Sequence, residues 1–204
     1  MAPSNKSYLI GKRAFDLAVC VLLLPIVVPL FLLCALAIFL ESPAGPFLIA
    51  QTRTGRDGIR FRMFKFRTMV PNAEALKPAL AHLNERSWPD FKITNDPRIT
   101  RVGRILRQSS LDELPQLINV VRGEMSLVGP RPTSFEASTY SLWHTYRLEV
   151  TPGITGLWQV KGRNKTDFNE RLRLDIEYVR CRSFGLDLKI LLETVHAVLK
   201  RSGA

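Results

Sequence analysis

The sequence predicts a mainly helical α+β fold that is attached to a membrane near its N-terminus. Two observations lead to this prediction. The run from Leu17 to Leu40 contains no charged residue, and segments with helical periodicity follow one another from about residue 98 onward, whereas a single short region has the pattern of paired strands. We therefore divide the 204 residues into an N-terminal membrane element, residues 1–40, and a second part, residues 41–204.

The apolar run is long enough to cross a bilayer. At a rise of 1.5 Å per residue its helix would reach about 36 Å, against a hydrocarbon core of about 30 Å. Pro25 and Pro29 lie in its middle, where each removes a backbone hydrogen bond and presses its ring against the preceding turn. Three interpretations follow: a cleaved signal peptide, a spanning helix, or a re-entrant helix that breaks at the prolines. The run exceeds the usual signal-peptide length, which disfavours the first.

The charges around the run favour the re-entrant interpretation. Basic residues flank both ends: Lys6, Lys12 and Arg13 before it, and Arg53, Arg56, Arg60 and Arg62 after it. Basic flanks are retained in the cytoplasm, and a spanning helix would place only one of them there. We therefore expect a helix that enters one leaflet and returns, which leaves residues 41–204 in the cytosol.

Residues 46–70 predict a small β-hairpin. Gly55 and Gly58 mark the turn between two β-prone runs. The apolar residues change phase after Met63, which predicts a bulge near that residue, with Lys65 and Arg67 pointing away from the core.

Amphipathic surface helices are expected in the rest of the chain. The prolines of residues 71–97 indicate an irregular excursion with at most a brief helix. Helical spacing follows in the segment around residues 98–108, and Asp167 with Glu170 forms a capping-box pattern before the next helix. A last helix is expected at about residues 186–200.

Composition points to an anionic partner. The net charge is +11 and the isoelectric point is about 10.1, which suits anionic lipid, a phosphate-rich substrate or nucleic acid. No helix-turn-helix, zinc or RNA-binding signature is present, which disfavours nucleic acid.

The three cysteines give no disulfide framework, and the isolated His82, His144 and His196 have no metal-ligand spacing.

The segment "SSLDELPQ" places two adjacent carboxylates, Asp112 and Glu113, in this basic chain. Ser110 and Glu113 match a capping box, so one interpretation is structural. Pro115 conflicts with it, because the proline falls where a helical amide should begin to donate. We therefore expect a tightened or distorted turn.

The alternative interpretation is phosphoryl chemistry. Arg107 precedes the acid pair, and "GPRP" holds Arg131 between two prolines. A second glycine-rich loop carries Arg163 and Asn164. Carboxylates can hold Mg²⁺ or attack phosphorus, and guanidinium groups neutralise phosphate oxygens.

The sequence resembles the bacterial sugar transferases, specifically the small monotopic phosphoglycosyl transferases. The matching segments are "KRAFDLAV", the proline-broken run, "FRMFKFRTM", "SSLDELPQLINVVRGEMSLVGPRP", "TPGITGLWQVKGRN" and "LDLKILLETVHAVLKRSG". The resemblance implies transfer of a phosphosugar from a UDP-sugar to polyprenol phosphate, giving polyprenol diphosphosugar and UMP. It also implies a location at the cytoplasmic face of the bacterial inner membrane, in the inner-leaflet lipids, and Mg²⁺ as cofactor.

The resemblance also implies roles for individual residues. Asp112 matches the nucleophile that forms a covalent phosphosugar ester, and Glu113 matches its partner acid, with both available to the metal. The positions matched to phosphate or substrate binding are Lys65, Arg67, Arg107, Arg131, Arg163 and Asn164. Pro29 aligns with the helix-breaking proline, and Pro25 can share its role because Val28 replaces a frequent serine. The motifs leave the transferred sugar and the oligomeric state open, and a membrane-tethered nucleic-acid binder or a non-catalytic scaffold stay as alternatives.

Overall fold

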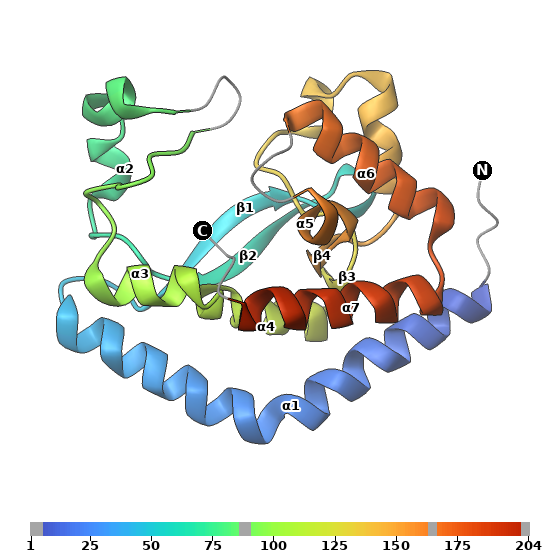
Figure 1. Cartoon of the computed structure of the whole chain (residues 1–204), viewed down its shortest axis with the longest axis horizontal. Helices are drawn as coiled ribbons and strands as arrows, with labels where there is room; N and C mark the ends of the chain where they lie inside the picture. The colour runs from blue at the N-terminus through green and yellow to red at the C-terminus, as the bar shows by residue number, and fades with distance from the viewer. Residues whose placement is uncertain (1–5, 86–90, 163–166, 201–204) are drawn as a thin grey trace.

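The computed structural model describes residues 6–85, 91–162 and 167–200, and confirms a mainly helical α+β fold. The long helix α1 (Lys6–Glu41) runs below the rest of the molecule, with a β-hairpin and the remaining helices above it (Figure 1). It is long and apolar enough to span a membrane, with a mean hydropathy of 3.0 over its most apolar window. Only 11% of that window is buried, so the helix exposes an apolar surface.

Helix α1 is bent rather than broken. It continues through Pro25 and Pro29 without interruption, which corrects the predicted helix break. In Figure 1 it forms a V whose two arms both rise toward the rest of the molecule. A proline removes one hydrogen bond and pushes the preceding turn aside, which kinks a helix while the neighbouring bonds still hold.

Polar contacts attach the N-terminal arm of α1 to the elements above it. Asp16 is 3% exposed and accepts hydrogen bonds from Ser126 Oγ at 2.7 Å and from the Leu127 amide at 3.3 Å. Lys12 Nζ lies 2.8 Å from the buried carboxylate of Asp187. This arm is therefore part of the folded body.

The C-terminal end of α1 is attached to the same body. The two carboxylate oxygens of Glu41 accept from the amides of Arg101 and Val102, at 2.7 and 3.0 Å. These are the first amides of helix α3 (Arg101–Gln108), so Glu41 satisfies donors that have no partner within that helix. Both ends of α1 are thus held on one side of its bend.

The expected hairpin is present, but its bulge is not. Strands β1 (Leu48–Thr54) and β2 (Arg60–Phe66) pair antiparallel in an unbroken register from Leu48↔Phe66 to Thr54↔Arg60. The predicted bulge near Met63 is therefore wrong. Phe66 is 1% exposed and packs on Phe31 of α1, with ring centroids 4.7 Å apart. Because this contact lies on the second face of the hairpin, apolar residues occur in both phases of the strand.

The remaining elements surround a second, parallel pair of strands, β3 (Ser126–Val128) and β4 (Gly153–Thr155). The helices are α2 (Ala73–Leu76), α4 (Gln116–Arg122), α5 (Leu157–Lys161), α6 (Phe168–Cys181) and α7 (Phe184–Leu199). The short 3₁₀ helices are η1 (Arg56–Gly58), η2 (Pro78–Leu83), η3 (Leu111–Glu113), η4 (Ala137–Thr139) and η5 (Leu142–Glu149). The core includes Val120, Met125, Tyr178 and Ile190, all at most 1% exposed.

The helix starts follow local sequence signals. Asp167 precedes α6 and accepts from the Glu170 amide at 2.7 Å, as its capping pattern predicts. Thr100 caps α3 in the same way, through the Gly103 amide at 2.9 Å.

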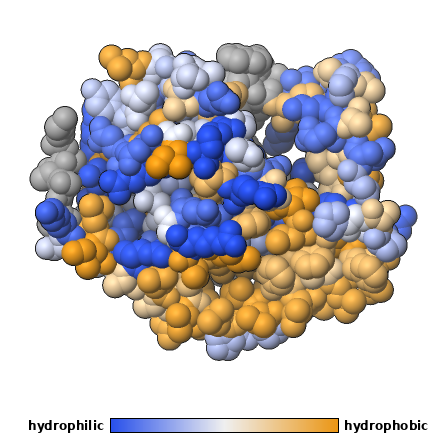
Figure 2. All heavy atoms as spheres, turned by 180° about the vertical axis from the view of Figure 1, so that it is seen from behind, coloured by the Kyte–Doolittle hydropathy of each residue, from blue (hydrophilic) through white to orange (hydrophobic). Residues whose placement is uncertain are grey.

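One edge of the molecule is apolar. Figure 2 shows a broad hydrophobic band along the lower part of the structure and hydrophilic side chains above it. Exposed apolar side chains occur on α1, α3, α4 and α7, for example Leu22, Ile105, Val121 and Leu192. This distribution is typical of a protein whose lower face lies in lipid.

Candidate functional site

The acid pair lies on the 3₁₀ turn η3, directly before α4. Ser110 has a left-handed backbone (φ 58°, ψ 15°), and its side chain makes no capping hydrogen bond, so the capping-box interpretation is wrong. Pro115 has no amide hydrogen, so regular α-helical bonding begins only at Gln116 and the preceding turn closes as 3₁₀. The expected distortion of this turn is confirmed.

Glu113 is held by two cations. Lys65 Nζ lies 2.8 Å from Oε1, and Arg131 donates to both carboxylate oxygens, with Nη1 3.3 Å from Oε2. Burial alone would raise the pKa of Glu113, but Arg131 and Lys65 outweigh it and hold the pKa well below its usual range. Glu113 is therefore an ionised anchor whose two oxygens are both engaged.

Asp112 is held much less firmly. Among the described residues its only ion pair is with Lys65 Nζ, at 3.8 Å, and no hydrogen bond reaches its carboxylate. Burial raises the pKa of Asp112 above its ordinary value, and the nearby Lys65 offsets only part of that rise. A partly desolvated carboxylate without firm hydrogen bonds is suited to act as a nucleophile or a ligand.

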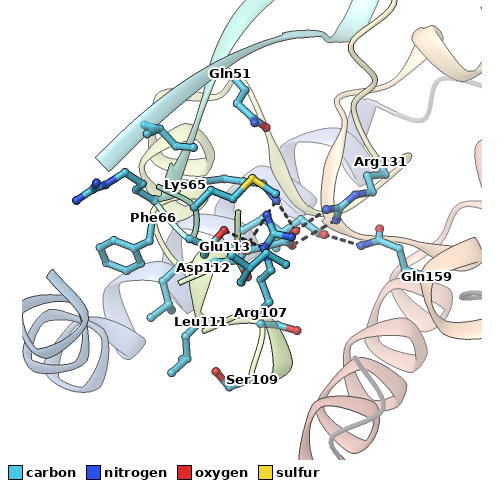
Figure 3. Close-up of a pocket in the computed structure, with 18 of the residues that line it drawn as sticks. Gln51, Lys65, Phe66, Arg107, Ser109, Leu111, Asp112, Glu113, Arg131 and Gln159 are labelled. Atoms are coloured by element: carbon cyan, nitrogen blue, oxygen red, sulfur yellow. Dashed lines mark hydrogen bonds and ion pairs between the residues drawn. The ribbon is translucent and has the colours of Figure 1, made fainter. Parts of the chain in front are cut away.

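These residues line one cavity of about 1200 Å³. Lys65, Arg107, Arg131 and the acid pair all contribute to its wall, and Figure 3 shows the side chains of Lys65 and Arg131 converging on Glu113. Arg107 is fixed by a hydrogen bond from Nε to Thr68 Oγ1 at 2.8 Å. The structure thus brings together five of the residues that the sequence singled out.

Arg67 has a different place. It is 6% exposed, and its terminal nitrogens donate to Ser42 Oγ and to the carbonyls of Ser42 and Gly45, at 3.1, 2.5 and 3.1 Å. The expectation that it points away from the core is wrong, because the chain after α1 folds over it. Arg67 borders the cavity, but its guanidinium braces the segment that joins α1 to the hairpin.

Arg163 and Asn164 lie outside the described residues. The helix before them, α5, brings Trp158 and Gln159 to the cavity wall. Pro25 and Pro29 lie at the bend of α1, where Leu23 and Val27 line the cavity.

Sequence reasoning missed a buried pair behind the site. Arg147 donates from Nη2 to the main-chain carbonyl of Arg131. It also pairs with Asp175, with Nε and Nη2 at 3.0 and 2.5 Å from Oδ2. Burial raises the pKa of Asp175 to about 6, although Arg147 opposes the rise. The sequence did carry one signal for this pair: Asp175 lies beside Leu172 and Ile176 on the apolar face of α6. A carboxylate buried among apolar residues needs a partner of opposite charge.

The donor set allows Mg²⁺ only together with a ligand. The described residues contain no group of three or more His, Cys, Asp or Glu side chains that could hold a metal. Mg²⁺ is, however, commonly bound by one or two carboxylates plus substrate phosphates. Asp112 fits that arrangement, because its oxygens are free of hydrogen bonds from the described residues, whereas Glu113 would reach a metal only if Arg131 or Lys65 released one of its oxygens.

Comparison with known proteins identifies relatives of the whole chain. A family model described as bacterial sugar transferase matches residues 7–201. The galactosyl transferase CpsE of Streptococcus agalactiae is 44% identical, covering 97% of this chain and 44% of its own length. The undecaprenyl-phosphate galactose phosphotransferase of Salmonella typhimurium is 46% identical, covering 95% and 41%. The UDP-glucose:undecaprenyl-phosphate glucose-1-phosphate transferase of Caulobacter vibrioides is 43% identical, covering 95% and 71%. The chain therefore spans less than half the length of the first two relatives.

Proposed function

The chain belongs to the bacterial sugar transferase family, and from this premise we propose that it transfers a phosphosugar from a UDP-sugar to polyprenol phosphate. The products are a polyprenol diphosphosugar and UMP, and the reaction is a first membrane step of glycoconjugate or polysaccharide synthesis. The names of the Salmonella and Caulobacter relatives, which specify undecaprenyl phosphate as acceptor, support this assignment.

The observation that carries the mechanism is the unequal environment of the two acids. Glu113 is anchored through both oxygens, whereas Asp112 is desolvated and weakly paired. In the first step, a carboxylate oxygen of Asp112 attacks the phosphorus that bears the sugar. The bond from this phosphorus to the bridging oxygen breaks, and UMP leaves with that oxygen. The sugar phosphate is then bound to Asp112 as an acyl phosphate.

In the second step the acceptor takes the phosphosugar. An oxygen of polyprenol phosphate attacks the same phosphorus, the bond to Asp112 breaks, and the aspartate is regenerated as a carboxylate. Arg131 and Lys65 stabilise negative charge on the phosphate oxygens, and Glu113 keeps both cations directed at the site. Arg107, on the Asp112 side, supplies a further cation.

Mg²⁺ is proposed as cofactor, held by Asp112 and Glu113 together with the diphosphate. When bound, it would supply additional positive charge to the phosphate oxygens of the donor.

The attachment of α1 at both ends supports a monotopic orientation. Asp16 and Lys12 fix one arm and Glu41 fixes the other, so both arms end at the same folded body. A helix held in this way would enter and leave the membrane on one side, and its basic flanks favour the cytoplasmic side of the inner membrane. The exposed apolar band in Figure 2 then lies in the inner leaflet.

Intact-protein mass spectrometry tests the proposed function. The purified protein is incubated with Mg²⁺ and a panel of UDP-sugars without acceptor, and the adduct is located by peptide mapping. We expect a phosphosugar adduct on Asp112 with at least one sugar, together with UMP release. Asp112→Asn should abolish both, because an amide has neither the charge nor the ester-forming oxygen. Glu113→Gln should slow adduct formation severely while still allowing some of it.

Three outcomes would contradict the assignment. An adduct mapped to Glu113 would reverse the roles of the two acids. Unimpaired UMP release by Asp112→Asn would exclude an aspartyl intermediate, and the absence of metal-dependent UMP release with every UDP-sugar would favour a non-catalytic scaffold.

A further inference from the structure

We propose that the apolar part of the cavity, between the bend of α1 and helix α7, holds the isoprenoid chain of the acceptor. This inference rests on the proposed function and adds a path by which the lipid reaches the acid pair. The isoprenoid chain would lie in the space between the bend of α1 and helix α7, rather than along the outer surface of the protein.

The wall of this part of the cavity comes from three helices. Leu23 and Val27 contribute from the bend of α1, Leu117 from α4, and Leu191 and Val198 from α7. The same cavity contains Asp112, so the apolar part is continuous with the catalytic part.

The chemistry of the wall selects hydrocarbon. The one polar side chain that α7 contributes is Thr194, whose hydroxyl already donates to the Ile190 carbonyl and contacts Thr155 Oγ1, each at 2.7 Å. A sugar or a peptide needs hydrogen-bond partners when it leaves water, whereas an isoprenoid chain needs none. The apolar wall suits an isoprenoid chain, and the charged residues around the acid pair suit the phosphate at the end of that chain.

The geometry of α1 leaves this space open toward the lipid. The two helices start together, where Tyr8 contacts Phe184 with ring centroids 5.3 Å apart and donates to Asp187. Figure 1 shows α1 diverging from α7 toward its bend. The bend lies next to exposed apolar residues such as Leu22 and Ile26, 75% and 65% exposed, so a chain can enter from the bilayer.

Two tryptophan substitutions on adjacent residues of α7 test the inference. Leu191 lines the cavity, whereas Leu192 is 64% exposed on the outer side of the same helix. We expect Leu191→Trp to raise the KM for a long polyprenol phosphate at least tenfold, while its aspartyl adduct still forms from the UDP-sugar alone. A short citronellyl phosphate acceptor should be much less affected. Leu192→Trp should resemble the wild type with both acceptors.

The control readouts separate this inference from the proposed function. Absence of the adduct in the wild type would refute the function itself. An unchanged KM for the long acceptor in Leu191→Trp, or an equal increase in Leu192→Trp, would overturn only the lipid path.

Photo-crosslinking of the unmodified protein keeps the inference testable even if Leu191→Trp fails to fold. A polyprenol phosphate with a diazirine near the phosphate end should label peptides that contain residues 23–27 and 191–198. Labelling elsewhere, or equal labelling of these peptides by a diazirine phospholipid, would overturn the assignment.

Discussion

Replacing Arg131 by lysine tests whether the shape of its guanidinium group, rather than its charge alone, organises the site. In the structure Nη1 lies 3.3 Å from Glu113 Oε2 while Nη2 donates to Oε1, so the planar group spans the carboxylate. A lysine ammonium retains the charge but cannot reproduce both contacts. Loss of one charge-assisted hydrogen bond costs about 1.5–3 kcal/mol. Because the Arg131 side chain is 31% exposed, we take about 2 kcal/mol, or about a 30-fold slower reaction.

The measurement is the single-turnover rate of UMP release with a saturating UDP-sugar, together with the thermal unfolding midpoint. Arg122→Lys is the matched control, because Arg122 lies on the neighbouring helix with its guanidinium 5.0 Å from the Phe64 ring, outside the cavity lining. It should react within about twofold of the wild type, a change below about 0.5 kcal/mol. A rate for Arg131→Lys within the same range would refute the bidentate role and leave Arg131 as a brace for its proline-rich loop.

Three further predictions concern the nucleophile, the bend and a helix contact. Because burial raises the pKa of Asp112, the single-turnover rate should fall as pH decreases through a value above the ordinary 3.8; a rate that stays flat down to about pH 4 would contradict an ionised Asp112 nucleophile. Replacing both prolines of α1 with leucine should straighten the helix and carry its N-terminus across the membrane; a cysteine tag labelled only from the cytoplasmic side would show that the polar contacts of α1 fix the bend. Gly103→Ala should destabilise the protein by about 1–3 kcal/mol in denaturant titration, because its Cβ would lie 2.1 Å from the Thr68 carbonyl oxygen. Gly185→Ala, with nothing within 4 Å, should be neutral or stabilising, and equal losses at both glycines would contradict the packing argument.

Local patterns were sufficient to predict much of the fold. The hairpin, α3, α6 and α7 follow from alternation, helical spacing and capping residues that lie within a few positions of one another. The acid pair could be selected because two adjacent carboxylates are unusual in a basic chain, with Arg107 just before them. Prolines mark the segments that hold the acid pair and Arg131.

Long-range packing explains what the sequence could not predict. The bulge was wrong because Phe64 and Phe66, on the face that local reasoning leaves in solvent, contact Arg122 of α4 and Phe31 of α1. The capping box was wrong because Glu113 finds partners 48 and 18 positions away, in Lys65 and Arg131, instead of at its own turn. The Arg147 and Asp175 pair joins positions 28 residues apart, which no local window contains.

Two adjacent residues of strand β2 contact the membrane helix and the reactive site. Phe66 packs against Phe31 of α1, while its neighbour Lys65 points to the other face and lies 2.8 Å from Glu113. Because adjacent residues of a strand point to opposite faces, the end of β2 both packs on the membrane helix and supplies a cation to the acid pair. The depth of the reactive site relative to the membrane helix is therefore set in part at this strand end.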